Sequence, residues 1–168
     1  MRILGIDPGS RITGYGVIES DGKRSSYIDS GCIHIKAVLI ADKLGIIFTE
    51  IDRVVKIHRP QELSVEQVFV SRNVASALKL GHARGAAICA AVNRGLPVSE
   101  YSPRTIKQAV VGSGAADKTQ IQHMVGRLLG LSHELRADAA DALAVALCHA
   151  HTTTTLHRLP IQLYGRRR

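Results

Sequence analysis

The chain has 168 residues, and about 150 residues is typical of one domain, so we predict a single compact domain rather than a two-domain enzyme. Its 22 Lys and Arg against 14 Asp and Glu give a net charge of +8, which makes a polyanion the first partner to consider. No apolar run reaches the length of a membrane span, and the three cysteines, Cys32, Cys89 and Cys148, show no metal-ligand spacing. We therefore expect an intracellular protein with no membrane segment and with buried free thiols.

Hydrophobic patterns and turn signals predict the elements in chain order. The predicted strands cover residues 3–7, 12–19, 25–35, 63–68 and 96–101, and the Asp21-Gly22 pair marks a hairpin turn between the second and third. The predicted helices cover residues 39–57, 74–92, 104–110, 118–129 and 137 to about 150. The result is an α/β fold with a five-stranded mixed sheet, in which three antiparallel strands come first and two more follow in β-α-β-α order.

One helix and the C-terminal end need separate interpretation. In the helix over 74–92, a stripe of apolar and small residues is predicted to pack inside the domain, although its glycines also permit close approach of a second subunit. We call it the small-residue stripe after its two glycines. It consists of Val74, Leu78, Gly81, Gly85, Ile88 and Val92, with Ala77 and Ala83 nearby. Residues 152–168 contain four threonines and three final arginines without periodicity. We expect a domain over 1–151 and a loose, basic tail over 152–168.

Four acidic residues lie in apolar surroundings. Residues 137–147 are apolar on every side of a helix except at Asp138 and Asp141, which share one helix face. Taken alone, either aspartate is best interpreted as a helix cap. However, Asp7 ends one buried strand and Glu66 lies in another, where an ionised side chain rarely lacks a partner. Together the four predict a site for Mg²⁺, and a carboxylate site in a basic protein fits nuclease chemistry.

Several separated motifs resemble one family. These motifs are Ile3-Leu4-Gly5-Ile6-Asp7-Pro8-Gly9-Ser10, Thr13-Gly14-Tyr15-Gly16, Val65-Glu66-Gln67-Val68-Phe69, Leu78-Lys79-Leu80-Gly81-His82-Ala83-Arg84-Gly85 and Ala137-Asp138-Ala139-Ala140-Asp141-Ala142. In this order and spacing they closely resemble the RuvC family of bacterial Holliday-junction resolvases, from Met1 to about Ala150. The resemblance implies an RNase H-like fold with flanking helices and a homodimer that makes paired nicks across a four-way DNA junction. It assigns the catalytic, metal-ligand role to Asp7, Glu66, Asp138 and Asp141.

Three further residues are candidates for DNA contact. Phe69 follows Glu66 and could stack on an unpaired base, with a hydrophobic plug as the alternative. Lys107 and Lys118 match family positions that approach DNA, although each could be an ordinary solvated lysine. Residues 112–119 nearly match the P-loop motif G-x-x-x-x-G-K-T, but Asp117 replaces the second glycine of the motif, so ATP binding is disfavoured. Glu100 is a further candidate acid that could equally pair with an arginine.

We therefore predict a crossover junction endodeoxyribonuclease that resolves Holliday junctions by symmetric, Mg²⁺-dependent hydrolysis of phosphodiesters in DNA recombination and repair. The resemblance implies two metal ions per site, for which Mn²⁺ can substitute, with Asp7 bridging the ions and Lys118 neutralising developing charge. It also implies cooperation with the RuvA–RuvB branch-migration complex and work on the nucleoid in the bacterial cytoplasm. The rival functions are a nonspecific or RNA-directed nuclease, a junction-binding protein that does not cut, and an actin-like ATPase, for whose two domains the chain is too short.

Overall fold

The computed structural model describes residues 1–68, 73–132 and 134–158 and contains one five-stranded mixed sheet. The strands lie in the order β3-β2-β1-β4-β5. Their bounds are β1 (Arg2–Asp7), β2 (Ile12–Ser20), β3 (Ser25–His34), β4 (Glu62–Glu66) and β5 (Val98–Tyr101). The first three strands are antiparallel neighbours, and β4 runs parallel to both β1 and β5. The predicted order of elements along the chain and the antiparallel pairing of the first three strands in a mixed sheet are confirmed.

The hairpin turn between β2 and β3 forms where the Asp-Gly pair predicts it. The Asp21 carboxylate accepts hydrogen bonds of 2.7 Å from the backbone N–H groups of both Lys23 and Arg24. Gly22 has a φ of 86°, a conformation that side chains disfavour. Since Arg2 pairs with Glu19, this turn lies at the opposite end of the sheet from Asp7.

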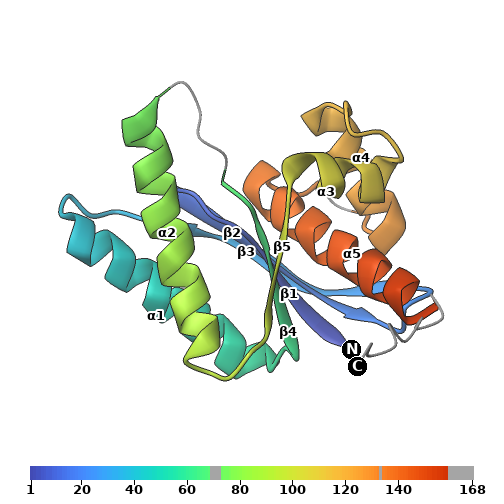
Figure 1. Cartoon of the computed structure of the whole chain (residues 1–168), viewed down its shortest axis with the longest axis horizontal. Helices are drawn as coiled ribbons and strands as arrows, with labels where there is room; N and C mark the ends of the chain where they lie inside the picture. Colours follow the sequence, from blue (N-terminus) through green and yellow to red (C-terminus); the bar gives the residue numbers. More distant parts are fainter. Residues whose placement is uncertain (69–72, 133, 159–168) are drawn as a thin grey trace, which may run out of the picture.

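Helices cover both faces of the sheet (Figure 1). Helices α1 (Ile40–His58) and α2 (Val74–Val92) pack on one face, and the other face carries α3 (Pro103–Val111), α4 (Lys118–Leu129) and α5 (Ala137–Arg158). Side chains alternate along a strand, so Leu4 of β1 joins the core under α1 and α2, whereas Ile3 joins the core under α5. Asp7 therefore shares the face of Ile3 and lies toward α5.

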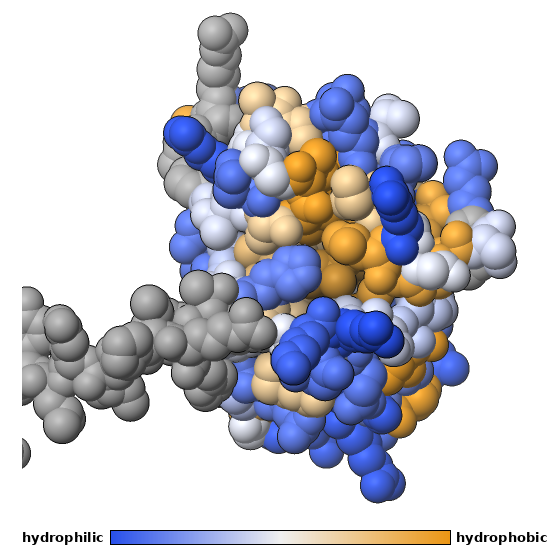
Figure 2. Space-filling model, turned by 90° about the vertical axis from the view of Figure 1, so that its right-hand side faces the viewer, coloured by the Kyte–Doolittle hydropathy of each residue, from blue (hydrophilic) through white to orange (hydrophobic). Residues whose placement is uncertain are grey.

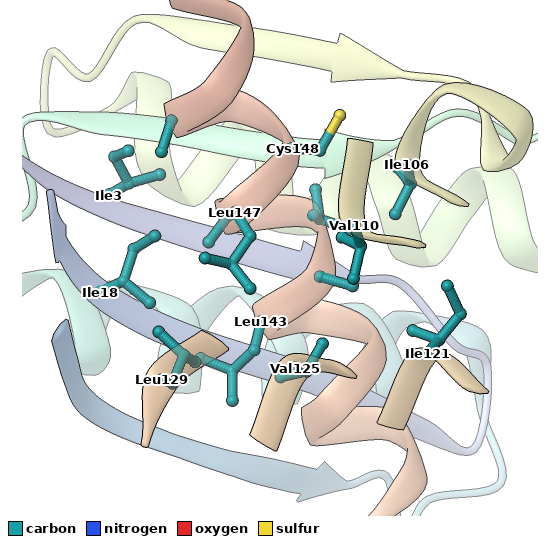
Figure 3. Packing of buried hydrophobic residues seen from close by; sticks show 14 of the residues in the cluster. Ile3, Ile18, Ile106, Val110, Ile121, Val125, Leu129, Leu143, Leu147 and Cys148 are labelled. Atoms are coloured by element: carbon teal, nitrogen blue, oxygen red, sulfur yellow. The ribbon is translucent and has the colours of Figure 1, made fainter. Parts of the chain in front are cut away.

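Helix α5 is the centre of the second core. Leu143 and Leu147 are fully buried, and Figure 3 shows them between the sheet residues Ile3 and Ile18 and side chains from α3 and α4 such as Val125. Almost every residue from Ala139 to Ala150 is buried, as expected for a helix that is apolar all round. The exception is Asp141, which is half-buried.

The prediction of a loose tail from Thr152 is wrong for its first part, because α5 continues to Arg158. The hydroxyls of Thr152 and Thr153 donate to the carbonyl oxygens of Cys148 and His149 one turn earlier, at 2.8 and 2.9 Å. These threonines thus satisfy their polar groups within a helix, which their composition does not indicate. The rest of the predicted tail, residues 159–168, lies outside the described residues.

Helix α2 packs on a different face from the predicted one. Its buried residues are Ala83, Ala87, Ala90 and Ala91. In contrast, the small-residue stripe is largely exposed: Val74, Leu78 and Val92 are 63%, 59% and 56% exposed, and the positions of Gly81 and Gly85 are open. Alanine lets α2 approach α1 closely, an advantage that hydrophobic periodicity does not weigh.

The buried-thiol prediction is correct only for Cys148, because Cys32 is half-buried and Cys89 is exposed. Among the described residues, no helix has the length and apolar character needed to cross a membrane.

On the side that carries α3 to α5, hydrophobic surface gathers in a central hollow ringed by hydrophilic side chains (Figure 2).

Candidate active site

Two of the predicted acids meet where adjacent parallel strands end. Ile6 of β1 pairs with Val65 of β4, so the next residues, Asp7 and Glu66, are neighbours at the carboxyl ends of these strands. Both side chains are half-buried on the face that α5 covers. The loop that follows Asp7 is held by Thr13, whose hydroxyl accepts from the Gly9 N–H at 3.3 Å and donates to the Gly9 carbonyl at 3.0 Å.

Helix α5 brings the other two acids to the same end of the sheet, and glycines on β1 and β2 allow it to lie there. A Cβ atom built on Gly14 would overlap the backbone carbonyl oxygen of Asp138, and one built on Gly5 would overlap that of Ala142. Asp138 therefore sits directly over β2, and Asp141 follows one turn later. Since α5 begins at Ala137, neither aspartate is its N-cap residue.

Burial and the clustered negative charge shift the pKa values of the residues in the site. Burial, together with the charges of Glu66, Asp141 and Asp138, raises the pKa of Asp7 from its ordinary 3.8 to about 8. Burial and the charge of Asp141 raise the pKa of Glu66, although a hydrogen bond with Asp7 opposes the rise. Lys118 is the cation that faces them: its Nζ lies 3.2 Å from Asp141 Oδ2, and this charge raises the pKa of Lys118.

The start of α4 fixes the position of Lys118. Asp117 is the N-cap residue and forms a capping box with Gln120, so Lys118 is the first residue of the helix. Asp117 thus caps a helix at the place where a phosphate-binding loop needs a glycine, which agrees with the expectation against ATP binding.

A cavity of about 220 Å³ opens between these groups. Asp7, Glu66 and Asp141 line it, as do the two candidate DNA-contact lysines, Lys107 and Lys118. The rest of its lining is Pro103, Ile106, Ile121, Ala144 and Val145. Two cations and three carboxylates in a partly apolar cavity can bind a phosphodiester while holding a polarising ion next to it.

The carboxylates fit a divalent cation in chemistry and charge, because they are oxygen ligands, and burial together with their mutual repulsion leaves Asp7 with a strongly raised pKa. In the part of the chain that the structure describes, however, no three acidic, histidine or cysteine side chains already lie close enough to hold an ion. Asp138 is also not among the residues that line the cavity.

The two remaining sequence candidates are Phe69 and Glu100. Phe69 is not among the described residues. Glu100 forms an ion pair of 2.5 Å with Arg84 on α2, on the opposite face of the sheet, so its role is the structural one that the sequence left open. Sequence reasoning assigned no role to Thr13 and Gly14. A glycine inside a strand, where it weakens the sheet, was the available signal for a close backbone approach.

Comparison with known proteins gives concordant matches. The family model described as crossover junction endodeoxyribonuclease RuvC matches residues 3–149. The RuvC enzymes of Marinobacter nauticus and Tolumonas auensis are 58% and 56% identical to this chain, covering 94% and 97% of it and 90% and 94% of those proteins. The structure of Thermus thermophilus RuvC matches with a TM-score of 0.84, and its complex with a Holliday junction substrate with 0.87. Each shares 34% identity and covers 92% of this chain and 96% of the other, so the fold is RNase H-like.

Proposed function

This chain belongs to the RuvC family of crossover junction endodeoxyribonucleases, and from that premise we propose how it resolves Holliday junctions. Asp7, Glu66, Asp138 and Asp141 form the catalytic site, and the enzyme makes one nick on each of two symmetric strands. The observation that carries this assignment is the convergence of acids from β1, β4 and α5 beside a cavity that also contains Lys107 and Lys118.

Family membership implies a divalent metal, and we propose that it is Mg²⁺, with two ions per site and Mn²⁺ as a substitute. The four carboxylates would hold the ions. When bound, such ions activate water and stabilise the leaving oxygen of a phosphodiester. The chain's own contribution is to orient oxygen ligands in a cavity that is partly closed to water and to place Lys118 where negative charge develops.

The DNA contacts follow from the same cavity. Lys107 and Lys118 would hold phosphates on either side of the scissile bond, because both side chains reach the cavity from the helices that cover it, α3 and α4. Phe69 follows Glu66 by three residues and would wedge against a base at the junction centre.

A homodimer would present two such sites to the two-fold junction. The exposed small-residue stripe on α2 is the surface we assign to the second subunit, because Leu78 and its neighbours expose apolar area beside open glycine positions. We also propose that this dimer cooperates with the RuvA–RuvB complex and acts on the nucleoid in the bacterial cytoplasm.

The test is cleavage of a labelled, immobile four-way junction beside a linear duplex of the same sequence, with Mg²⁺ or with chelator. We expect paired, symmetric nicks on the junction alone, and only with Mg²⁺. Asp7→Asn and Asp138→Asn should bind the junction without cutting it, whereas Asp21→Asn, an acid in the turn at the other end of the sheet, should cut normally.

Each rival gives a different pattern. Normal nicking by Asp7→Asn contradicts the carboxylate site, and equal cutting of the linear duplex indicates a nonspecific nuclease. Tight binding without nicks in any metal indicates a protein that only binds junctions.

A further inference from the structure

A second cavity lies across the β1–β2 loop from the carboxylates. It has a volume of about 320 Å³ and is lined by residues from the first halves of α1 and α2 and from the segments that precede α1. Arg11, Lys43 and Lys79 line it together with Ser10 and the apolar residues Val38 and Ile40. We call this cavity the Lys43 groove.

The charge of the Lys43 groove is uncompensated. No acidic residue is among its described lining residues, and within the described part of the chain Arg11, Lys43 and Lys79 form no side-chain ion pair or hydrogen bond. On the same side of the sheet, by contrast, Lys56 and Arg94 both pair with Asp52, at 2.8 and 2.5 Å. Three unpaired cations along one groove produce a local positive potential that favours a polyanion.

One short loop connects the groove to the candidate active site. Arg11 and Ser10 belong to the short loop that leaves Asp7, and the Thr13–Gly9 hydrogen bonds hold this loop in place. A duplex carries one negative charge per ~1.7 Å of its axis, so a backbone that passes Asp7 has further phosphates within reach of these cations.

We propose that the Lys43 groove binds the phosphodiester backbone of the junction arm that continues from the cleaved strand. This inference rests on the proposed function and adds to it a binding surface on the α1–α2 side of the protein, separate from the cavity of Lys107 and Lys118. The groove contacts phosphates rather than bases, so it strengthens binding without choosing the sequence that is cut.

The test measures junction binding in chelator, where no cutting is expected, as a function of salt concentration. For Lys43→Gln/Lys79→Gln, the slope of log Kobs against log [salt] should be shallower than that of the wild type by about 1.8, or ~0.9 per lost phosphate contact. Lys43→Arg/Lys79→Arg keeps both charges and should restore the slope.

The matched control is Lys23→Gln/Arg24→Gln, which removes two exposed cations at the far end of the sheet and should keep the wild-type slope. An equal loss of slope in both glutamine variants overturns the groove and indicates a general effect of net charge. A fall in the molecular mass in solution of Lys43→Gln/Lys79→Gln alone also overturns the proposal, because the groove would then be a contact between subunits. If the wild-type protein itself neither binds nor cuts junctions, the proposed function fails, and this inference fails with it.

Discussion

The raised pKa of Asp7 predicts that the metal-free protein becomes more stable when this carboxylate is removed. A group whose pKa is higher in the folded state stabilises the fold below its ordinary pKa and loses that contribution as the pH rises toward the folded value. For Asp7 this interval runs from 3.8 to about 8. At about 1.4 kcal/mol per pH unit, the upper bound on the penalty at pH 8 is about 6 kcal/mol.

We expect Asp7→Asn to remove about half of this upper-bound penalty, or about 3 kcal/mol. Glu66 and Asp141 remain beside the new amide, and the amide itself must be desolvated. For a chain of this length each 1 kcal/mol changes the unfolding temperature by roughly 2–4 °C, so the metal-free variant should unfold roughly 6–12 °C above the wild type at pH 8. Near pH 4 the difference should vanish, because Asp7 is then largely protonated in the folded wild type.

Thermal unfolding followed by circular dichroism, in chelator and across this pH range, measures the effect. Asp21→Asn is the control of opposite sign: hydrogen bonds from the N–H groups of Arg24 and Lys23 lower the pKa of Asp21, so that variant should show no rise in unfolding temperature. Added Mg²⁺ should raise the unfolding temperature of the wild type more than that of Asp7→Asn. If Asp7→Asn unfolds at or below the wild-type temperature at pH 8 without metal, the carboxylates do not repel one another as described.

Four further variants test the site and the helices around it. Gly14→Ala should abolish cutting in the cleavage assay, because its Cβ would overlap the backbone of α5. Gly126→Ala, in the middle of α4 where a Cβ meets no other atom, should keep cleavage activity and raise the free energy of unfolding by about 1 kcal/mol. Lys118→Gln should slow single-turnover cleavage on the order of 100-fold at saturating protein, and an unchanged rate would place Lys118 outside the reaction. His149→Leu should destabilise the fold by about 3 kcal/mol in urea unfolding, because the buried His149 ring forms hydrogen bonds with both Tyr101 and Glu62. A change below about 0.5 kcal/mol, the usual range for a surface substitution, would contradict this.

Much of the fold was predictable from local pattern. Pro8-Gly9 ends the β1 run, the Asp21-Gly22 turn defines a hairpin, and the helix around Asp138 is apolar all round. The order of strands and helices along the chain and the burial of α5 were therefore predictable. The convergence of the acids was predictable for the same reason, since a carboxylate inside an apolar element is costly and therefore informative.

What the sequence pattern missed depends on contacts that hydrophobic periodicity does not encode. The packing face of α2 was wrong because alanines such as Ala87 carry little hydrophobic signal, yet they allow α2 to pack closely on α1. The extension of α5 past Thr152 depends on hydroxyls that bond to its own preceding turn. Predicting the ion pair between Glu100 and Arg84 would have required knowing that β5 lies beside α2.

The site combines features that each oppose stability when taken alone. Gly14 weakens a strand, and Asp7 repels its acidic neighbours in a partly buried place. The fold tolerates both because α5, which carries Asp138, is otherwise buried on all sides and therefore contributes much of the second core. The same close contact of α5 with the sheet concentrates the charge, so a divalent cation would relieve strain that the packing itself creates. This coupling explains why we expect one substitution at Asp7 to change stability and cutting in opposite directions.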